Sequence, residues 1–195
     1  MTILVDMDDT MECLLEAWIA RINAIHNLNV QKCDIKEWDL RVAFPTLTQE
    51  EIFAPINTVE LWQNVKPKDG AVKYLKQLIA DGHNIIVVTA SHYDSVALKM
   101  KEVLFKHFPF IPYEDVIITS RKQLINGDVL IDDAPHNLVG GTYKPILFNA
   151  PHNQELNAEK YGMIRVNSWE EVYQAIKDIE DKELDTLLET LPNCN

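Results

Sequence analysis

Lysine and arginine are scarce in this sequence, which has 18 of them against 30 aspartates and glutamates and a formal net charge of −12. A surface that binds the backbone of a nucleic-acid polymer or an anionic membrane needs clustered cationic side chains. The composition therefore argues against both kinds of partner. A small anionic substrate would need a metal ion or a local group of cationic residues.

Cysteines are also few and widely spaced. Cys13, Cys33 and Cys194 are odd in number and form no C-x-x-C pair, which is typical of free thiols in a reducing compartment rather than of disulfides or a zinc site. The longest apolar runs have only strand length, and the chain enters a strand-like segment without a basic and hydrophobic leader. We therefore expect a soluble, cytoplasmic protein.

The apolar segment Ile3-Leu4-Val5 leads directly into the acidic motif Asp6-Met7-Asp8-Asp9-Thr10. A short apolar run of this kind predicts a strand that is buried on both faces of a parallel sheet. In open α/β sheets, ligands bind beyond the carboxyl ends of the strands, which is where Asp6 stands. Asp6 is a candidate nucleophile, because attack by a carboxylate on phosphorus gives a covalent acyl phosphate that is hydrolysed in a second step.

Asp8 follows Asp6 by two residues, and the two carboxylates could share one Mg²⁺ ion, which prefers a few hard oxygen ligands together with phosphate. Because a neighbouring like charge raises the pKa of one member of a carboxylate pair, Asp8 could protonate the leaving alkoxide and later deprotonate water. The alternative is structural. Asp8, Asp9 and Thr10 are residue types that turn the chain and cap a following helix, and the motif alone does not decide between the two interpretations.

The first part of the chain shows two kinds of pattern. Apolar residues at intervals of three and four predict an amphipathic helix over residues 11–27. Residues 28–65 mix aspartate, proline and aromatic residues around one short helix, which Thr48 and Glu51 open with a capping box. This composition is typical of a cap inserted into a larger domain.

Strand-like segments recur after residue 66, and each leads into polar residues. They are Ile85–Val88 before Thr89, Val116–Ile118 before Thr119, Val129–Ile131 before Asp132, and Pro145–Phe148 before Asn149. Helical patterns separate them, as crossovers between parallel strands require. The order predicts an α/β fold with a doubly wound, Rossmann-like parallel sheet.

These patterns divide the chain into three parts. Residues 1–27 and 66–180 form the predicted catalytic core, and residues 28–65 form a small helical cap inserted after the first strand and helix. Residues 181–195 form an acidic C-terminal tail or helix.

The polar residues after the predicted strands suit phosphoryl transfer. Thr89 would donate to a phosphate oxygen, and Lys122 would neutralise charge on the phosphate and on Asp6. Asp132 and Asp133 would complete a metal site. Each residue alone has a plain alternative, namely the end of a strand, a surface cation or a turn. Their joint position at one edge of the sheet favours the catalytic interpretation.

On these residues the chain resembles the haloacid dehalogenase-like superfamily of aspartate-nucleophile phosphatases. The four motifs of that superfamily match Asp6/Asp8/Thr10, Thr89, Lys122 and Asp132/Asp133 in order. More narrowly, three stretches are similar to the 5′(3′)-deoxyribonucleotidases, which dephosphorylate deoxynucleoside monophosphates with Mg²⁺. They are Leu4–Asp8, the Leu61-Trp62 pair before Pro67 and Gly70, and Val129–Asp133.

The resemblance implies a role for each matched residue. Asp6 is the expected nucleophile, and the Asp8 side chain is the acid and base. The expected Mg²⁺ ligands are Asp6, the main-chain carbonyl of Asp8, and Asp133, while Asp132 supports the site from outside the ligand set. Asp9 stands where the family commonly has glycine and would bind substrate through its backbone amide.

The cap is expected to cover the site and to present an aromatic face to a nucleobase, since stacking is worth about 1–3 kcal/mol per base in single-strand binders. Trp38 and Trp62 are the candidates for this base pocket, and Ser91 is a further substrate-binding candidate. Phe44 and Phe53 are assigned to the interior of the cap. Three histidines that follow strands could line the cleft, although the mechanism needs none of them: His92, His136 and His152.

The sequence thus predicts a Mg²⁺-dependent phosphatase that hydrolyses deoxyribonucleoside 5′(3′)-monophosphates through an aspartyl phosphate. Three alternatives stay open: a phosphatase for a sugar phosphate or another small phosphomonoester, a non-catalytic nucleotide-binding protein, and a phosphotransferase with an acceptor other than water. Leu14 stands where the family can place an aromatic residue against the base, so base preference does not carry over. Oligomeric state and the choice between 5′ and 3′ or deoxy and ribo substrates are equally open.

Overall fold

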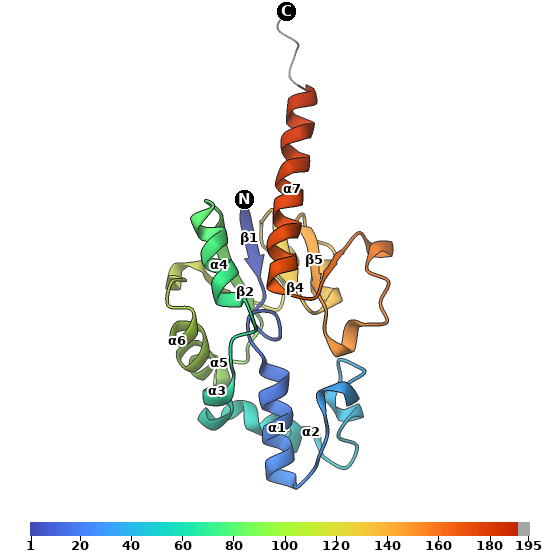
Figure 1. The fold of residues 1–195 in the computed structure, drawn as a ribbon. Coiled ribbons are helices and arrows are strands. Elements are labelled where there is room, and N and C mark those ends of the chain that lie inside the picture. The colour runs from blue at the N-terminus through green and yellow to red at the C-terminus, as the bar shows by residue number, and fades with distance from the viewer. Residues whose placement is uncertain (191–195) are drawn as a thin grey trace, which may run out of the picture.

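The computed structural model describes residues 1–190, so the predicted free thiol at Cys194 lies outside the described residues. Its centre is a six-stranded parallel sheet in the order β3-β2-β1-β4-β5-β6 (Figure 1). The strands are β1 (Thr2–Val5), β2 (Asn84–Thr89), β3 (Val116–Ile118), β4 (Val129–Asp132), β5 (Lys144–Phe148) and β6 (Ile164–Val166). The predicted α/β fold with a parallel sheet is confirmed.

Strand β1 shows why the sheet forms at this position. Ile3 and Val5 face one apolar cluster and Leu4 faces another, and all three are fully buried. This alternation is what a strand with two covered faces requires. Long helices cover the first face, whereas short 3₁₀ turns and loops cover the second.

The helices on the first face bury apolar side chains against the sheet. They are α4 (Ala71–Ala80), the run of α5 (Tyr93–Lys99), η4 (Met100–Leu104) and α6 (Phe105–His107), and α7 (Trp169–Thr190). In the middle run, η4 is a π-helical turn that begins directly after Lys99. Such turns occur frequently at functional sites.

Short 3₁₀ turns lead into β3 and fill the connections after β3, β4 and β5. The turn η5 (Tyr113–Asp115) precedes β3, and those in the connections are η6 (Lys122–Leu124), η7 (Pro135–Leu138), η8 (Pro151–Asn153) and η9 (Glu159–Tyr161). Leu138 and Met163 from these connections pack on the second face of the sheet. The sheet is therefore wound on both sides, but its second layer is built from turns.

A further layer lies beyond the carboxyl ends of the strands (Figure 1). It contains α1 (Leu14–His26), η1 (Lys32–Asp34), η2 (Leu40–Val42), α2 (Gln49–Phe53), η3 (Ala54–Asn57) and α3 (Val59–Asn64). The predicted capping box is confirmed, because Glu51 N donates to Thr48 Oγ1 at 3.2 Å and Thr48 N donates to Glu51 Oε2 at 2.8 Å.

Helix α1 packs within this layer. Its buried residues join an apolar cluster made with the segment that follows it: Leu15, Ile19 and Ile22 with Ile35, Leu40, Phe44 and Ile52.

The chain passes from the sheet into this layer near Cys13 and returns to the sheet near Lys66, and these two chain crossings lie side by side. Cys13 N donates to Lys66 O at 2.9 Å, and Lys68 N donates to Met11 O at 2.8 Å.

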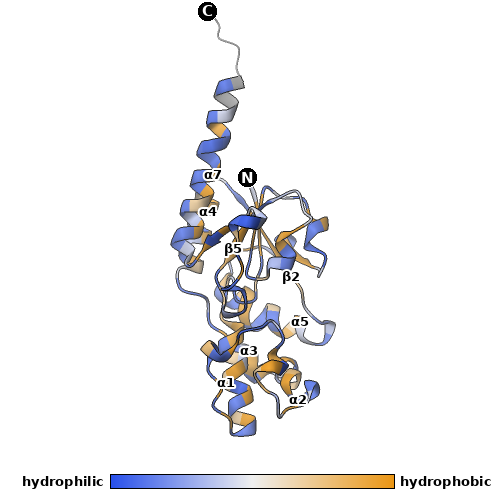
Figure 2. Cartoon of the chain, turned by 90° about the vertical axis from the view of Figure 1, so that its right-hand side faces the viewer, coloured by the Kyte–Doolittle hydropathy of each residue, from blue (hydrophilic) through white to orange (hydrophobic). Residues whose placement is uncertain are grey.

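Two elements of the C-terminal part differ from what the sequence predicts: strand β6 and helix α7. Strand β6 was not predicted, because it has three residues and Arg165 interrupts its apolar run. Helix α7 continues through Thr190, so the first part of the acidic tail extends this helix past the sheet, where it is mostly hydrophilic (Figures 1 and 2). Among the helices of residues 1–190, none combines the length and apolar character of a membrane span.

Candidate active site

Asp6 and Asp132 meet where the strand order of the sheet reverses. Strands β1 and β4 are neighbours in the sheet but are separated along the chain by β2 and β3. Asp6 follows β1 directly, its amide donates to Ile131 O at 2.9 Å, and Asp132 is the last residue of β4. A reversal of this kind opens a crevice at the carboxyl ends of the strands.

Lys122 joins these two carboxylates. Its ammonium is buried and donates to Asp6 and to Asp132 Oδ2, the latter at 2.6 Å. Burial alone would lower the pKa of Lys122, but the charges of Asp6 and Asp132 outweigh it and raise this pKa. The lysine therefore remains a cation inside the site.

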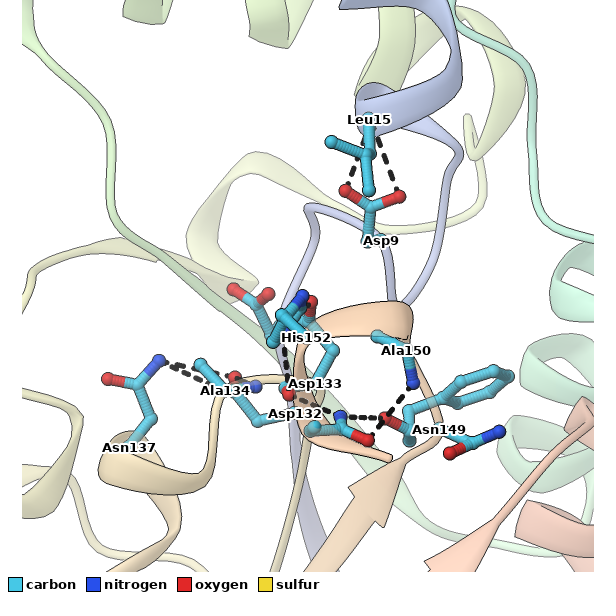
Figure 3. Close-up of polar contacts among 12 residues, drawn as sticks. Asp9, Leu15, Asp132, Asp133, Ala134, Asn137, Asn149, Ala150 and His152 are labelled. Atoms are coloured by element: carbon cyan, nitrogen blue, oxygen red, sulfur yellow. Dashed lines mark hydrogen bonds and ion pairs between the residues drawn. The ribbon is translucent and has the colours of Figure 1, made fainter. Parts of the chain in front are cut away.

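Asp132 is committed to structural contacts on both of its carboxylate oxygens. Besides Lys122 it accepts from the amide of Ala134 at 2.8 Å and from Asn137 Nδ2 at 3.2 and 3.0 Å. Figure 3 shows Ala134 and Asn137 beside this carboxylate. These contacts suit a residue that orients the lysine.

Three carboxylates lie close enough to hold one cation. Asp6, Asp132 and Asp133 each offer an oxygen, and these oxygens lie within 4.8 Å of one another. Burial, together with the neighbouring negative charges, raises the pKa of Asp6 to about 7 and that of Asp133 well above its usual range. A divalent cation would relieve this repulsion, and a set of hard oxygen donors fits Mg²⁺.

Lys99 is a site residue that the sequence analysis missed. Its ammonium is buried and donates to Asp8 Oδ2 at 2.7 Å and to Thr89 Oγ1 at 2.6 Å. Since an ammonium can only donate, Thr89 Oγ1 accepts this bond, and its own hydrogen is free for a phosphate oxygen. Its helical spacing was an available signal, because Lys99 stands four residues after Ser95 and four before Val103, and both of these residues are buried.

Asp9 shows that capping and site formation coexist in the first motif. Its φ is +53°, a left-handed conformation that favours glycine. The Asp9 carboxylate accepts from the amide of Leu15 at 3.1 and 3.3 Å (Figure 3), whereas Cys13 makes no capping bond. Burial raises the pKa of Asp9 to about 6. The structural alternative for Asp9 thus describes its side chain correctly.

The loop of the first motif is also held from the far end of the chain. The fully buried indole of Trp169, at the start of α7, donates from Nε1 to the carbonyl of Thr10 at 2.9 Å. Glu12, two residues later, is fully buried as well, and burial together with the charge of Asp8 raises its pKa well above the usual range. The motif is therefore surrounded by protein on the side away from the cavities.

Two cavities meet at Asp8. The first has a volume of about 420 Å³ and reaches Asp9, Asp133 and His152 past the ring of Trp38. The second has a volume of about 510 Å³ and reaches Lys99 and Ser91 past Trp62. Both share a wall contributed by the helical layer and the first motif: Asp8, Leu14, Trp18, Gln49 and Phe53.

The aromatic side chains of the helical layer differ in their exposure to solvent. Trp38 is 60% exposed, whereas Trp62 is 2% exposed and donates from Nε1 to Ile56 O at 2.7 Å. Phe44 is buried in the interior of the layer, as expected. Phe53 differs from the expectation, because it is 42% exposed and lines both cavities, with its ring edge-on to Trp18.

Known proteins resemble this chain over most of its length. A profile of the family described as 5′ nucleotidase, deoxy (pyrimidine), cytosolic type C protein matches residues 1–184. The 5′(3′)-deoxyribonucleotidase of Bacillus subtilis is 34% identical over 171 residues, which cover 87% of this chain and 95% of the relative. That of Clostridium acetobutylicum is 30% identical over 180 residues, which cover 92% and 97%.

Solved structures resemble the fold. A HAD family hydrolase from Deinococcus radiodurans, with bound phosphate and sodium, has a TM-score of 0.59 and 16% sequence identity to this chain. The likeness covers 91% of this chain and 95% of the other.

Proposed function

This chain belongs to the 5′(3′)-deoxyribonucleotidase family of haloacid dehalogenase-like phosphomonoester hydrolases, and on that premise we propose that it hydrolyses deoxyribonucleoside 5′(3′)-monophosphates through a phosphoaspartate on Asp6. The observation that carries the proposal is the group of side chains around Asp6. The buried ammonium of Lys122 donates to the Asp6 carboxylate, and the buried ammonium of Lys99 donates to both Asp8 and Thr89. All of these residues lie at the edge of the sheet where ligands bind in open α/β folds.

In the first half-reaction, a carboxylate oxygen of Asp6 attacks phosphorus and the bond from phosphorus to the ester oxygen breaks. Asp8, held by Lys99 at 2.7 Å, gives its proton to that oxygen as the alcohol leaves. Thr89 and Lys122 hold phosphate oxygens by hydrogen bond and charge. Ser91 is a further donor candidate at the wall of the second cavity.

In the second half-reaction, Asp8 takes a proton from water, and the oxygen of that water attacks phosphorus. The bond from phosphorus to Asp6 breaks, which releases inorganic phosphate, restores the carboxylate of Asp6 and leaves Asp8 protonated for the next cycle. The charge on the phosphate oxygens would be neutralised by Mg²⁺ held by Asp6, the main-chain carbonyl of Asp8, and Asp133. Asp132 orients Lys122 from outside this ligand set.

For the nucleoside, the cavities offer apolar and aromatic walls of sufficient volume. The exposed ring of Trp38 is the stronger stacking candidate, because Trp62 presents a nearly buried ring. Asp9 contributes its backbone amide beside the phosphate. We also propose that α1 belongs with the cap, since it packs with the segment that follows it; the cap then extends from Leu14 to about Val65.

The test measures phosphate release from a panel of 5′ and 3′ deoxy- and ribonucleoside monophosphates and simple sugar phosphates, with Mg²⁺ or with EDTA. Asp6→Asn removes the nucleophile, and Asp178→Asn, at an exposed position of α7, is the matched control. Mg²⁺-dependent turnover that favours deoxynucleotides and is lost only in Asp6→Asn supports the proposal.

Other outcomes separate the alternatives. Turnover of sugar phosphates alone keeps the chemistry and discards the substrate. Nucleotide binding without turnover at saturating Mg²⁺ contradicts the enzymatic proposal and favours a binding protein. A phosphorylated product formed from an added alcohol indicates a phosphotransferase.

A further inference from the structure

Asp133 is held from the connection between β5 and β6 by two adjacent side chains. His152 Nε2 lies 3.1 Å from the main-chain oxygen of Asp133 and 3.3 Å from its Oδ2, and Asn153 Nδ2 donates to the same main-chain oxygen at 2.7 Å. Figure 3 shows His152 against Asp133. Because a main-chain carbonyl can only accept, Nε2 is the nitrogen that carries hydrogen in this contact.

Asn153 has a rigid anchor of its own. Arg165, from β6, donates to Asn153 Oδ1 at 2.8 Å and to Asn153 O at 3.0 Å, and it also reaches Asn149 Oδ1 at 2.8 Å and Leu156 O at 2.7 Å. All of these groups belong to the core. The side-chain contacts of Asn153 are thus made to the core.

His152 is held differently, because its ring contacts the cap. The ring of Trp38 lies edge-on to His152, with 4.8 Å between ring centroids and an angle of 87° between the planes. Trp38 also lies edge-on to His136 at 5.3 Å and 85°. Edge-on aromatic pairs attract each other more strongly than the burial of their surface alone would explain. A single exposed ring of the cap thus contacts the residue that touches Asp133.

We propose that His152 is a positioning residue for Asp133 and that Trp38 holds His152 in place, so that the position of the cap and the affinity for Mg²⁺ are coupled. The inference rests on the proposed function, because it takes Asp133 as a Mg²⁺ ligand. Hydrogen-bond partners that orient metal ligands commonly affect metal affinity 10–100-fold. Coupling between two sites is reciprocal, so bound Mg²⁺ would in turn favour the contact of Trp38 with His152.

The test is the dissociation constant of Mg²⁺, measured by titration calorimetry on the full chain without substrate. His152→Phe keeps an aromatic ring for Trp38 and removes the N–H, and we expect binding about 10- to 100-fold weaker. His152→Gln retains an N–H donor and should recover part of the affinity. Trp38→Leu leaves the N–H in place but frees the ring, and we expect binding at least about 5-fold weaker.

Two further variants distinguish coupling from a general loss of packing. His136→Phe changes the other histidine that Trp38 contacts, and it should bind Mg²⁺ within about two-fold of the unaltered protein, a small fraction of the coupled effect. The double variant Trp38→Leu/His152→Phe should bind no more weakly than His152→Phe alone, because Trp38 acts through His152. Melting temperatures in EDTA report whether each variant is folded.

Equal Mg²⁺ affinity in His152→Phe and the unaltered protein would overturn the inference while leaving the proposed function intact, provided that the unaltered protein shows Mg²⁺-dependent turnover. Equal losses in His136→Phe and His152→Phe would overturn it too, since the effect would then belong to the aromatic contacts as a whole. Absence of Mg²⁺ binding by an unaltered protein that shows Mg²⁺-dependent turnover would overturn the inference alone, whereas absence of both binding and turnover would overturn the proposed function as well.

Discussion

Lys99 and Asp8 form an ion pair, in which the buried ammonium nitrogen of Lys99 lies 2.7 Å from Oδ2 of the half-buried Asp8. The same ammonium donates to Thr89 Oγ1 at 2.6 Å. One cation from helix α5 therefore fixes the proposed acid and base after β1 together with the proposed phosphate donor at the end of β2. Loss of this cation would remove the hydrogen bond that orients each of the two side chains toward a bound phosphate.

Replacing Lys99 should affect substrates according to their leaving groups. Lys99→Met frees Asp8, and positioned acid–base catalysis is worth about 10²–10⁴-fold, so we expect kcat for a deoxynucleotide to fall by about 100-fold. p-Nitrophenolate needs no proton to leave, so p-nitrophenyl phosphate should lose less than about 10-fold. Steady-state kinetics with both substrates provide the comparison. Lys101→Met, at a side chain that is 80% exposed, should leave both rates unchanged, and equal losses in Lys99→Met would contradict the role.

Replacing Lys122 should destabilise the metal-free protein. Lys122→Met leaves Asp6 and Asp132 buried without their shared cation, and breaking a buried pair typically costs about 3–5 kcal/mol. Urea unfolding in EDTA measures the free energy of unfolding. The double variant Lys122→Met/Asp132→Asn removes one of the uncompensated charges and should recover part of the loss. Unchanged stability in the single variant would refute the argument.

Phe53 and Phe44 offer a matched pair of substitutions in the helical layer. Phe53 lines both cavities, so Phe53→Ala should remove an aromatic wall of the nucleoside site and raise KM for nucleotides by about 5- to 100-fold. Phe44 is buried in the interior, so Phe44→Ala should instead lower the free energy of unfolding by about 3–5 kcal/mol. Steady-state kinetics and chemical unfolding of both variants separate the two effects. A raised KM in Phe44→Ala together with a lowered free energy of unfolding in Phe53→Ala would contradict both roles.

Stability below neutral pH should depend on His83. This residue lies between the amino group of Met1, 3.4 Å from Nδ1, and Glu180 of α7, 3.5 Å from Nε2, and burial lowers its pKa below the ordinary 6.5. The amino group and Lys177 lower this pKa further, whereas Glu180 and Asp81 raise it. The unfolded chain therefore takes up a proton at a higher pH than the folded chain does.

It follows that the stability contributed by neutral His83 is present above pH 6.5 and is lost as the pH falls below that value. Melting temperatures measured between about pH 5 and 8 should fall less steeply on acidification in His83→Gln than in the unaltered protein. Parallel curves for the two proteins would assign the pH dependence to other groups.

The sequence was informative where chemistry and a strand end coincide. Asp6, Thr89 and Asp132 each follow or end an apolar run, and parallel strands bring their carboxyl ends to one edge. Lys122 could be placed by the same rule, because it follows β3 by a short turn. These positions can be predicted from one sequence, because the local pattern of residues locates each strand and the general rule for parallel sheets places the strand ends together.

The remaining features depend on contacts between distant segments. The role of Lys99 is decided by how α5 packs against β2, and its helical pattern does not contain that information. Strand β6 is recognised by its pairing with β5 and is too short to show a period. Likewise, the apolar face of α1 predicts a helix but does not indicate whether the sheet or the following segment covers it.

The adjacent chain crossings at Cys13–Lys66 and Met11–Lys68 have an evolutionary consequence. Everything between them leaves and re-enters the sheet through neighbouring points, so one contiguous stretch of about fifty residues can be exchanged, lengthened or shortened while the strand register stays the same, in the way that insertions at closely spaced ends are tolerated. The reacting carboxylates and lysines stand on the sheet side of that junction or on helices packed against it. If this stretch covers the substrate as proposed, mutations within it can change which substrate is bound while the residues of the chemistry stay in place.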